Sequence, residues 1–116
     1  MSDTPVNIDK LEEMKQVMGE VFDQLVPAYL DQSDEMINAM PDLLETNTID
    51  VLERHAHSMK SSSLNMGAET LSEIARILEQ MSRDKEDSAL LKEKVDLISA
   101  EYAQVRDILQ NYIQQS

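Results

Sequence analysis

The chain has 116 residues, a formal net charge of −13, two glycines, three prolines and no cysteine. This length fits a single domain, and the lack of cysteine excludes disulfides and thiolate metal sites. The negative charge disfavours nucleic acid and anionic membranes as partners, so a protein partner is expected. No run approaches the roughly 20 apolar residues of a membrane span, and residues 1–6 lack a signal-peptide pattern, so the expected location is the cytoplasm.

The composition favours helices throughout. Leu, Met, Glu, Gln and Ala are abundant, whereas clusters of β-branched residues are few and aromatic residues make up 3% of the chain. Residues 1–7 are expected to form a flexible leader. A short helix should follow, with Asp9 as its N-cap and Gly19 as its stop.

A long apolar stripe then runs from Phe22 to Leu44 with helical spacing. The stripe keeps its phase across Pro27 and Pro41, which favours one kinked helix. Pro27 would also suit the first turn of a helix that starts later. The sequence leaves these two arrangements open.

Three further helices are predicted. The first spans about residues 49–65 and ends before a turn at Gly67. The second has its apolar residues within 71–81, and the third has its apolar residues within 91–112. Four main helices with short connections and one short leading helix predict an all-α fold. We therefore expect residues 8–116 to form an antiparallel up-and-down four-helix bundle with a short extra N-terminal helix.

The third predicted helix carries two histidines, His55 and His57. Residues two apart on a helix point in directions that differ by about 200°, so the two rings cannot share a face. The core stripe of this helix consists of Leu52, Ala56, Met59, Ser63 and Met66. His55 falls at the edge of this stripe, and His57 falls outside it. Helical metal ligands are usually three or four residues apart, so no metal site is expected.

The neighbours of His57 favour phosphoryl chemistry. Lys60 and Ser61 follow it by three and four residues and so lie beside its ring. A neutral imidazole has a nucleophilic nitrogen, a lysine can offset the charge of phosphoryl oxygens, and a small residue leaves room for the group. The chain lacks a glycine-rich phosphate loop, so it is expected to carry a phosphoryl group without kinase activity of its own.

The segment H-S-M-K-S-S-S-L-N-M-G-A, from His57 to Ala68, resembles the pattern of the histidine-containing phosphotransfer (HPt) family. That pattern has a histidine, two residues, a lysine, a run of small residues and then Gly-Ala before the next helix. The pair Leu78-Glu79 also falls where the family has it, and the resemblance covers about residues 8–115. The sequence departs from the pattern at Ser61, where the family usually has glycine.

The resemblance implies a stand-alone bacterial-type phosphorelay protein. His57 would accept a phosphoryl group from a receiver-domain aspartate and pass it to another response-regulator receiver, with Lys60 and Ser61 stabilising the group. The implied partners are the receiver domains of response regulators and hybrid sensor kinases. The receiver would supply Mg²⁺, so no cofactor is expected on this chain.

The resemblance also implies supporting roles for other residues. Glu79 and Arg83 of the fourth helix would lie near the acceptor, and Glu53, Arg54 and Leu64 would contribute to partner docking. A monomer is expected. The alternative function is a helical-bundle module that docks receiver domains without accepting a phosphoryl group.

Overall fold

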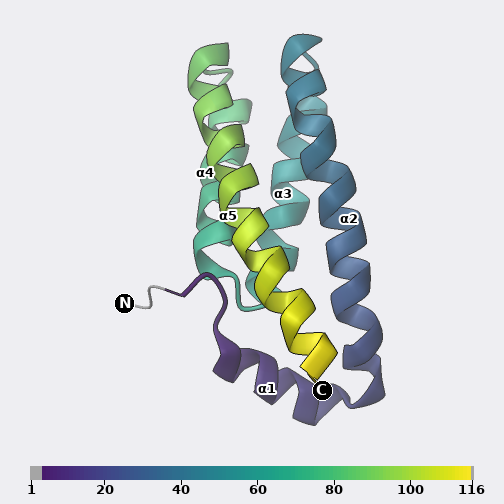
Figure 1. The fold of residues 1–116 in the computed structure, drawn as a ribbon. Helices are drawn as coiled ribbons and strands as arrows, with labels where there is room; N and C mark the ends of the chain where they lie inside the picture. Colours follow the sequence, from purple (N-terminus) through teal and green to yellow (C-terminus); the bar gives the residue numbers. More distant parts are fainter. Residues whose placement is uncertain (1–3, 116) are drawn as a thin grey trace.

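The computed structural model describes residues 4–115. Its helices are α1 (Ile8–Met18), α2 (Glu20–Glu45), α3 (Ile49–Asn65), α4 (Glu69–Arg83) and α5 (Ser88–Gln115). Helices α2 to α5 run alternately up and down, and α1 lies across one end of the bundle (Figure 1). This confirms the predicted all-α bundle with a short extra helix at its N-terminal end.

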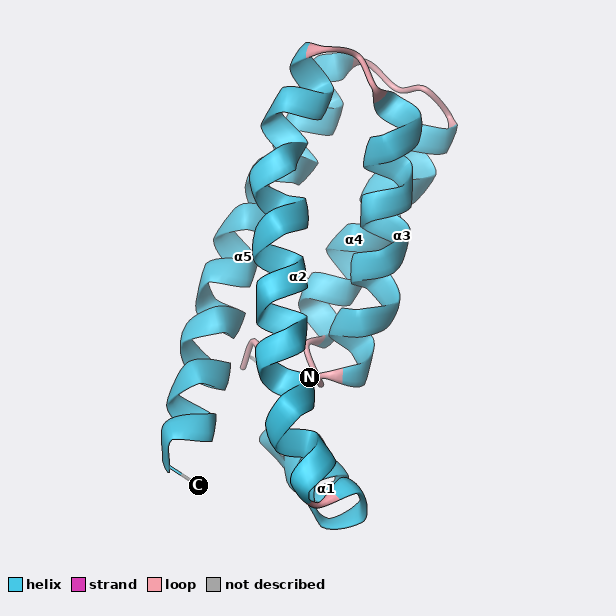
Figure 2. Ribbon diagram, turned by 90° about the vertical axis from the view of Figure 1, so that its right-hand side faces the viewer, coloured by secondary structure: helices cyan, strands magenta, loops and turns pink. Residues whose placement is uncertain are grey.

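Helix α2 is continuous across both of its prolines, and Figure 2 shows it as one element along the bundle. It begins at Glu20, so the alternative that placed Pro27 in a first turn is wrong. Pro27 and Pro41 are both exposed. Pro27 has no N–H to donate to the carbonyl of Asp23, and Asp23 is itself exposed, so water can bind that carbonyl. Within residues 4–115, no helix combines the length and apolar character that crossing a membrane requires.

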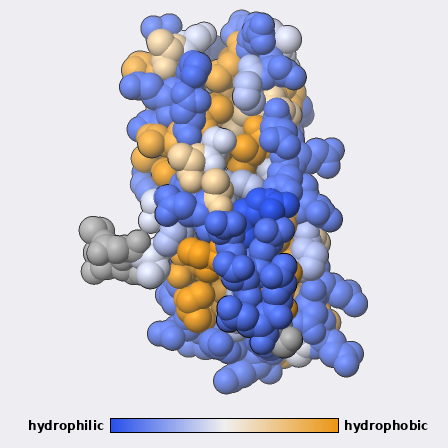
Figure 3. All heavy atoms as spheres, in the orientation of Figure 1, coloured by the Kyte–Doolittle hydropathy of each residue, from blue (hydrophilic) through white to orange (hydrophobic). Residues whose placement is uncertain are grey.

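The core lies where the apolar stripes of the helices meet. The whole predicted stripe of α3 is buried, as are Phe22 and Val26 of α2, and α3 packs most extensively against α4. The face shown in Figure 3 is mainly hydrophilic, with apolar side chains gathered in separate patches. Burial of apolar surface stabilises this association by about 25 cal/mol per Å², so each apolar stripe faces inward.

Polar contacts join α2 to α3 at a buried site and to α5 at a partly buried one. The hydroxyls of Tyr29 and Ser63 are 2.8 Å apart and link α2 to α3. The Tyr102 hydroxyl of α5 donates to Asp34 Oδ1 at 2.6 Å, and the Arg106 guanidinium donates to the same carboxylate at 3.0 Å. The hydrogen bond from Arg106 is the main cause that lowers the pKa of Asp34.

The start of α1 differs from the prediction. Asn7, and not Asp9, is the N-cap, because its side-chain oxygen accepts from the Lys10 backbone N–H at 3.3 Å. Val6 and Asn7 were assigned to the flexible leader, yet Val6 is only 1% exposed and the Asn7 N–H donates to the Gly67 carbonyl at 2.8 Å. Residues 1–3 of that leader lie outside the described residues.

The predicted turn at Gly67 is confirmed. Gly67 has a φ of +78°, a backbone conformation that favours glycine, and a Cβ there would lie 3.0 Å from the Asn7 carbonyl oxygen. The Lys10 ammonium donates to the Leu64 carbonyl at 2.7 Å, just before the turn. Contacts from α1 and the residues before it therefore hold the α3–α4 connection.

Replacing Gly67 with alanine should destabilise the fold by about 2 kcal/mol in urea unfolding, because both backbone conformation and space oppose a Cβ. Gly19→Ala is the matched control. Gly19 also has a positive φ, of +59°, but a Cβ there would meet nothing within 4 Å. Equal losses in the two variants would show that the contact with Asn7 adds nothing.

Replacing Asp34 with asparagine should cost about 1–2 kcal/mol of stability at pH 7, because the carboxylate accepts charge-assisted hydrogen bonds. The pKa of Asp34 is lowered in the folded state, so its contribution to stability is present at pH values above the ordinary pKa of aspartate, about 3.9. It is lost as the pH falls through the lowered value. The difference between wild type and Asp34→Asn should therefore shrink in acid unfolding.

The matched control for this carboxylate is Asp96→Asn, which removes a carboxylate that pairs with Lys92 on the exposed face of α5. Exposed pairs contribute little, so this variant should unfold almost as wild type does. A constant gap between wild type and Asp34→Asn down to pH 2 would contradict the assigned role of the Asp34 charge.

Candidate functional site

The two histidines of α3 differ in exposure as the helical wheel predicts. The His57 side chain is 62% exposed, whereas His55 is partly buried. Burial lowers the pKa of His55, the charge of Arg54 lowers it further, and Glu35 opposes the shift. Among residues 4–115, no group of three or more His, Asp or Glu side chains could hold a metal ion.

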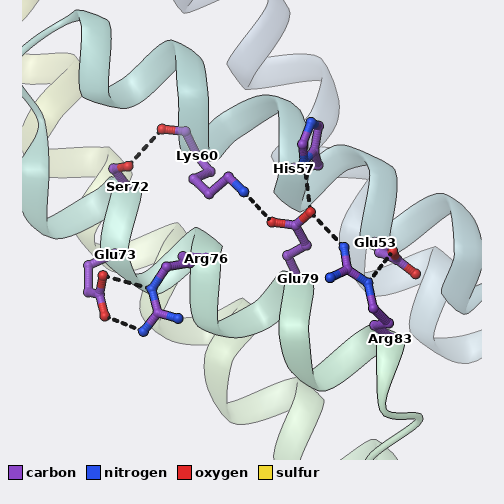
Figure 4. A network of polar contacts seen from close by, with 8 residues as sticks. All are labelled: Glu53, His57, Lys60, Ser72, Glu73, Arg76, Glu79 and Arg83. Carbon is purple, nitrogen blue, oxygen red and sulfur yellow. Dashed lines mark hydrogen bonds and ion pairs between the residues drawn. The ribbon is translucent and has the colours of Figure 1, made fainter.

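A buried carboxylate on α4 lies directly beside the exposed ring. Glu79 has a side chain only 7% exposed, and its Oε2 lies 2.7 Å from Nδ1 of His57. Its Oε1 accepts from the Lys60 ammonium at 2.7 Å, and its Oε2 also accepts from the Arg83 guanidinium at 3.0 Å (Figure 4). A buried charge is costly without partners, and here three donors surround it.

The ionisation of Glu79 follows from these contacts. Burial alone would raise the pKa of this carboxyl, but the hydrogen bonds from Lys60 and His57 and the charge of Lys60 outweigh it, so the pKa of Glu79 is lowered. At neutral pH the side chain is therefore a carboxylate, which can accept hydrogen bonds and cannot donate them. The ring nitrogen that faces it must be the donor.

This contact assigns the tautomer of His57. With Nδ1 donating to Glu79, a neutral imidazole carries its hydrogen on Nδ1 and a lone pair on Nε2. The ring is largely exposed, so a second molecule can reach it. The arrangement presents a nucleophilic nitrogen on the surface of the bundle.

Further polar contacts hold α3 and α4 together on both sides of Glu79. The Ser72 hydroxyl of α4 donates to the Lys60 carbonyl at 2.7 Å, and Arg83 Nε donates to Glu53 Oε2 at 3.1 Å (Figure 4). Ser72 was not identified from the sequence. The sequence signal for such a contact is weak, because Ser72 stands out only as a small polar residue next to Leu71, and both lie on the buried face of α4.

The remaining predicted residues lie around this cluster. Ser61 and Arg54 are exposed on α3, and Leu64 is an exposed large hydrophobic residue on the same helix. The carboxylate of Glu53 pairs with Arg83 and so belongs to the polar network, and its contribution to partner docking stays a prediction. Glu79 and Arg83 were assigned as supporting groups, and the structure brings both into that network with Lys60.

Comparisons with known proteins agree with this fold. The family model described as Hpt domain matches residues 24–113. A solved structure, histidine-containing phosphotransfer protein B (HptB) from Pseudomonas aeruginosa PAO1, is similar with a TM-score of 0.88 and 24% identity, covering 99% of each chain. The comparison with curated proteins finds no match.

These findings differ in what they support. The likeness to HptB, at 24% identity, shows a shared helical fold. The family match extends from the first turns of α2 almost to the end of α5, which is well over half of the chain and includes α3 and α4. The chain therefore belongs to the Hpt domain family, whose members are phosphocarriers with a histidine phosphotransfer role in phosphorelays.

Proposed function

We propose that His57 accepts a phosphoryl group from the aspartyl phosphate of a receiver domain and passes it to the aspartate of another. The observation that carries this proposal is the exposed imidazole whose Nδ1 donates to the ionised Glu79. Such a ring keeps the lone pair on Nε2 available for attack on phosphorus. Membership of a phosphocarrier family supports the same reaction.

Lys60 and Ser61 would stabilise the transferred group. The Lys60 ammonium is held against Glu79 but its side chain remains 31% exposed, so it can approach incoming phosphoryl oxygens. Its charge would offset negative charge that is spread over those oxygens during transfer. Ser61 is exposed one helical turn after His57, where its hydroxyl can donate a hydrogen bond.

The partner would supply the remaining groups. Phosphoryl transfer at an aspartate commonly needs a divalent cation, and we place the Mg²⁺ on the receiver domain. The exposed residues Arg54 and Leu64 on α3 would contribute to the docking surface. We propose receiver domains of response regulators and hybrid sensor kinases as the partners, with the chain acting as a monomer in the cytoplasm.

The test of the acceptor is a transfer assay with a radiolabelled phosphorylated receiver domain. His57→Gln should take up no acid-labile label, because glutamine has no nucleophilic ring nitrogen. The matched control is His55→Gln, two residues away on the same helix, which should be labelled as wild type is. Label that persists in His57→Gln and disappears in His55→Gln would show that the acceptor has been misassigned.

The same assay separates the two candidate functions. A docking module without phosphotransfer would bind the receiver domain but never take up label. Binding measured by calorimetry without any labelling of wild type would therefore favour the docking module.

Lys60→Ala should slow transfer about tenfold to a hundredfold, equivalent to about 1.4–2.7 kcal/mol of transition-state stabilisation. Lys60→Arg keeps the charge and should retain most of the rate. Single-turnover transfer to a receiver domain, measured by rapid quench, gives the rate constant. An unchanged rate in Lys60→Ala would remove Lys60 from the reaction.

A further inference from the structure

We infer that Glu79 keeps the proton on Nδ1 of His57 after phosphoryl transfer as well as before it, so that the phosphorylated ring is a cation. This inference rests on the proposed function and adds a positioning residue that acts on both directions of transfer. It concerns the state of the ring when the phosphoryl group leaves, because that state decides whether the leaving group is a neutral imidazole or an anion.

The step balances without moving any proton. In the forward direction the Nε2 lone pair forms the N–P bond while the O–P bond of the aspartyl phosphate breaks, which releases an aspartate carboxylate. The ring, still carrying its hydrogen on Nδ1, becomes a phosphoimidazolium. In the reverse direction a carboxylate oxygen attacks phosphorus, the N–P bond breaks, and its electron pair returns to Nε2 of a neutral imidazole.

The geometry supports a lasting hold on the Nδ1 hydrogen. The contact to Glu79 is 2.7 Å long, and the Glu79 carboxylate is only 7% exposed. A carboxylate that close to an imidazolium forms a charge-assisted hydrogen bond, which burial strengthens. Without that charge, the phosphorylated ring would lose the Nδ1 hydrogen more readily, and its leaving group would then be an imidazole anion.

The other charged groups around the ring come from the same two helices. Helix α3 contributes Lys60 and Glu53, and α4 contributes Arg83 beside Glu79. Helix α2 also packs on α3, but its Glu35 acts on His55, on the other side of α3. Lys60 and Arg83 oppose the effect of the Glu79 charge, and Glu53 pairs with Arg83. The Glu79 carboxylate is the charged group in direct contact with Nδ1 of His57, at 2.7 Å.

The test is a ¹⁵N NMR titration of Nδ1 in the full chain after phosphorylation with phosphoramidate. We expect wild type to lose the Nδ1 hydrogen at a pH about one unit or more above that of Glu79→Gln. Glutamine can still accept from Nδ1 but has no charge. The matched control is Glu73→Gln on the same helix, which removes an exposed carboxylate that pairs with Arg76 and should titrate as wild type does.

The rate of transfer to a receiver domain should follow the same titration. Above each midpoint the rate should fall about tenfold per pH unit, because only the protonated ring is a good leaving group. The decline should therefore begin at lower pH in Glu79→Gln than in wild type or Glu73→Gln. A purely structural role for Glu79 would lower the rate equally at every pH.

Coincident midpoints for wild type and Glu79→Gln would overturn the inference while leaving His57 as the acceptor. Failure of phosphoramidate or a receiver to label His57 would instead refute the proposed function. If Glu79→Gln does not fold, the comparison is made between native wild type and the same phosphorylated chain unfolded in urea. A native midpoint no higher than the unfolded one would also overturn the inference.

Discussion

The Glu79 carboxylate constrains both the packing of α3 against α4 and the chemistry of the exposed ring. A charge that is 7% exposed requires compensation, and Lys60, His57 and Arg83 provide it from two helices. These partners fix the axial position of one helix relative to the other, because a shift of one turn would move donors by about 5.4 Å. The same contacts that stabilise the charge orient the imidazole. Stability and function therefore depend here on one group.

Much of the fold follows from helical spacing, since burial of each apolar stripe needs only the periodicity of one helix. The choice between His55 and His57 follows for the same reason. The contact between His57 and Glu79 is different, because spacing within a single helix carries no information on how two helices align. Only the family pattern pointed to Glu79. Asn7 and Asp9 are both good capping residues, and the hydrogen bond from the Asn7 N–H to the Gly67 carbonyl explains why Asn7 is the N-cap of α1.

Ser61 is where the chain departs from the family pattern, and its surroundings show why the departure is tolerated. The residue is exposed on α3, whereas Ser63, two positions later, is buried and bonded to Tyr29. A side chain at an exposed helical position displaces no neighbour, and serine is less unfavourable in a helix than glycine. The glycine of the pattern is thus not required by the packing of this bundle. Any cost of the serine would arise only when a partner approaches.

The family match begins at residue 24, whereas the buried chain begins at Val6. The intervening segment supplies a buried Leu11 and the Asn7 and Lys10 contacts to the α3–α4 connection. A domain boundary drawn from sequence similarity would therefore cut through the packed unit. A segment that is to be joined to another protein as a folded bundle must therefore include α1. Exchanging the matched segment alone would separate the phosphotransfer helices from the element that closes their connecting turn.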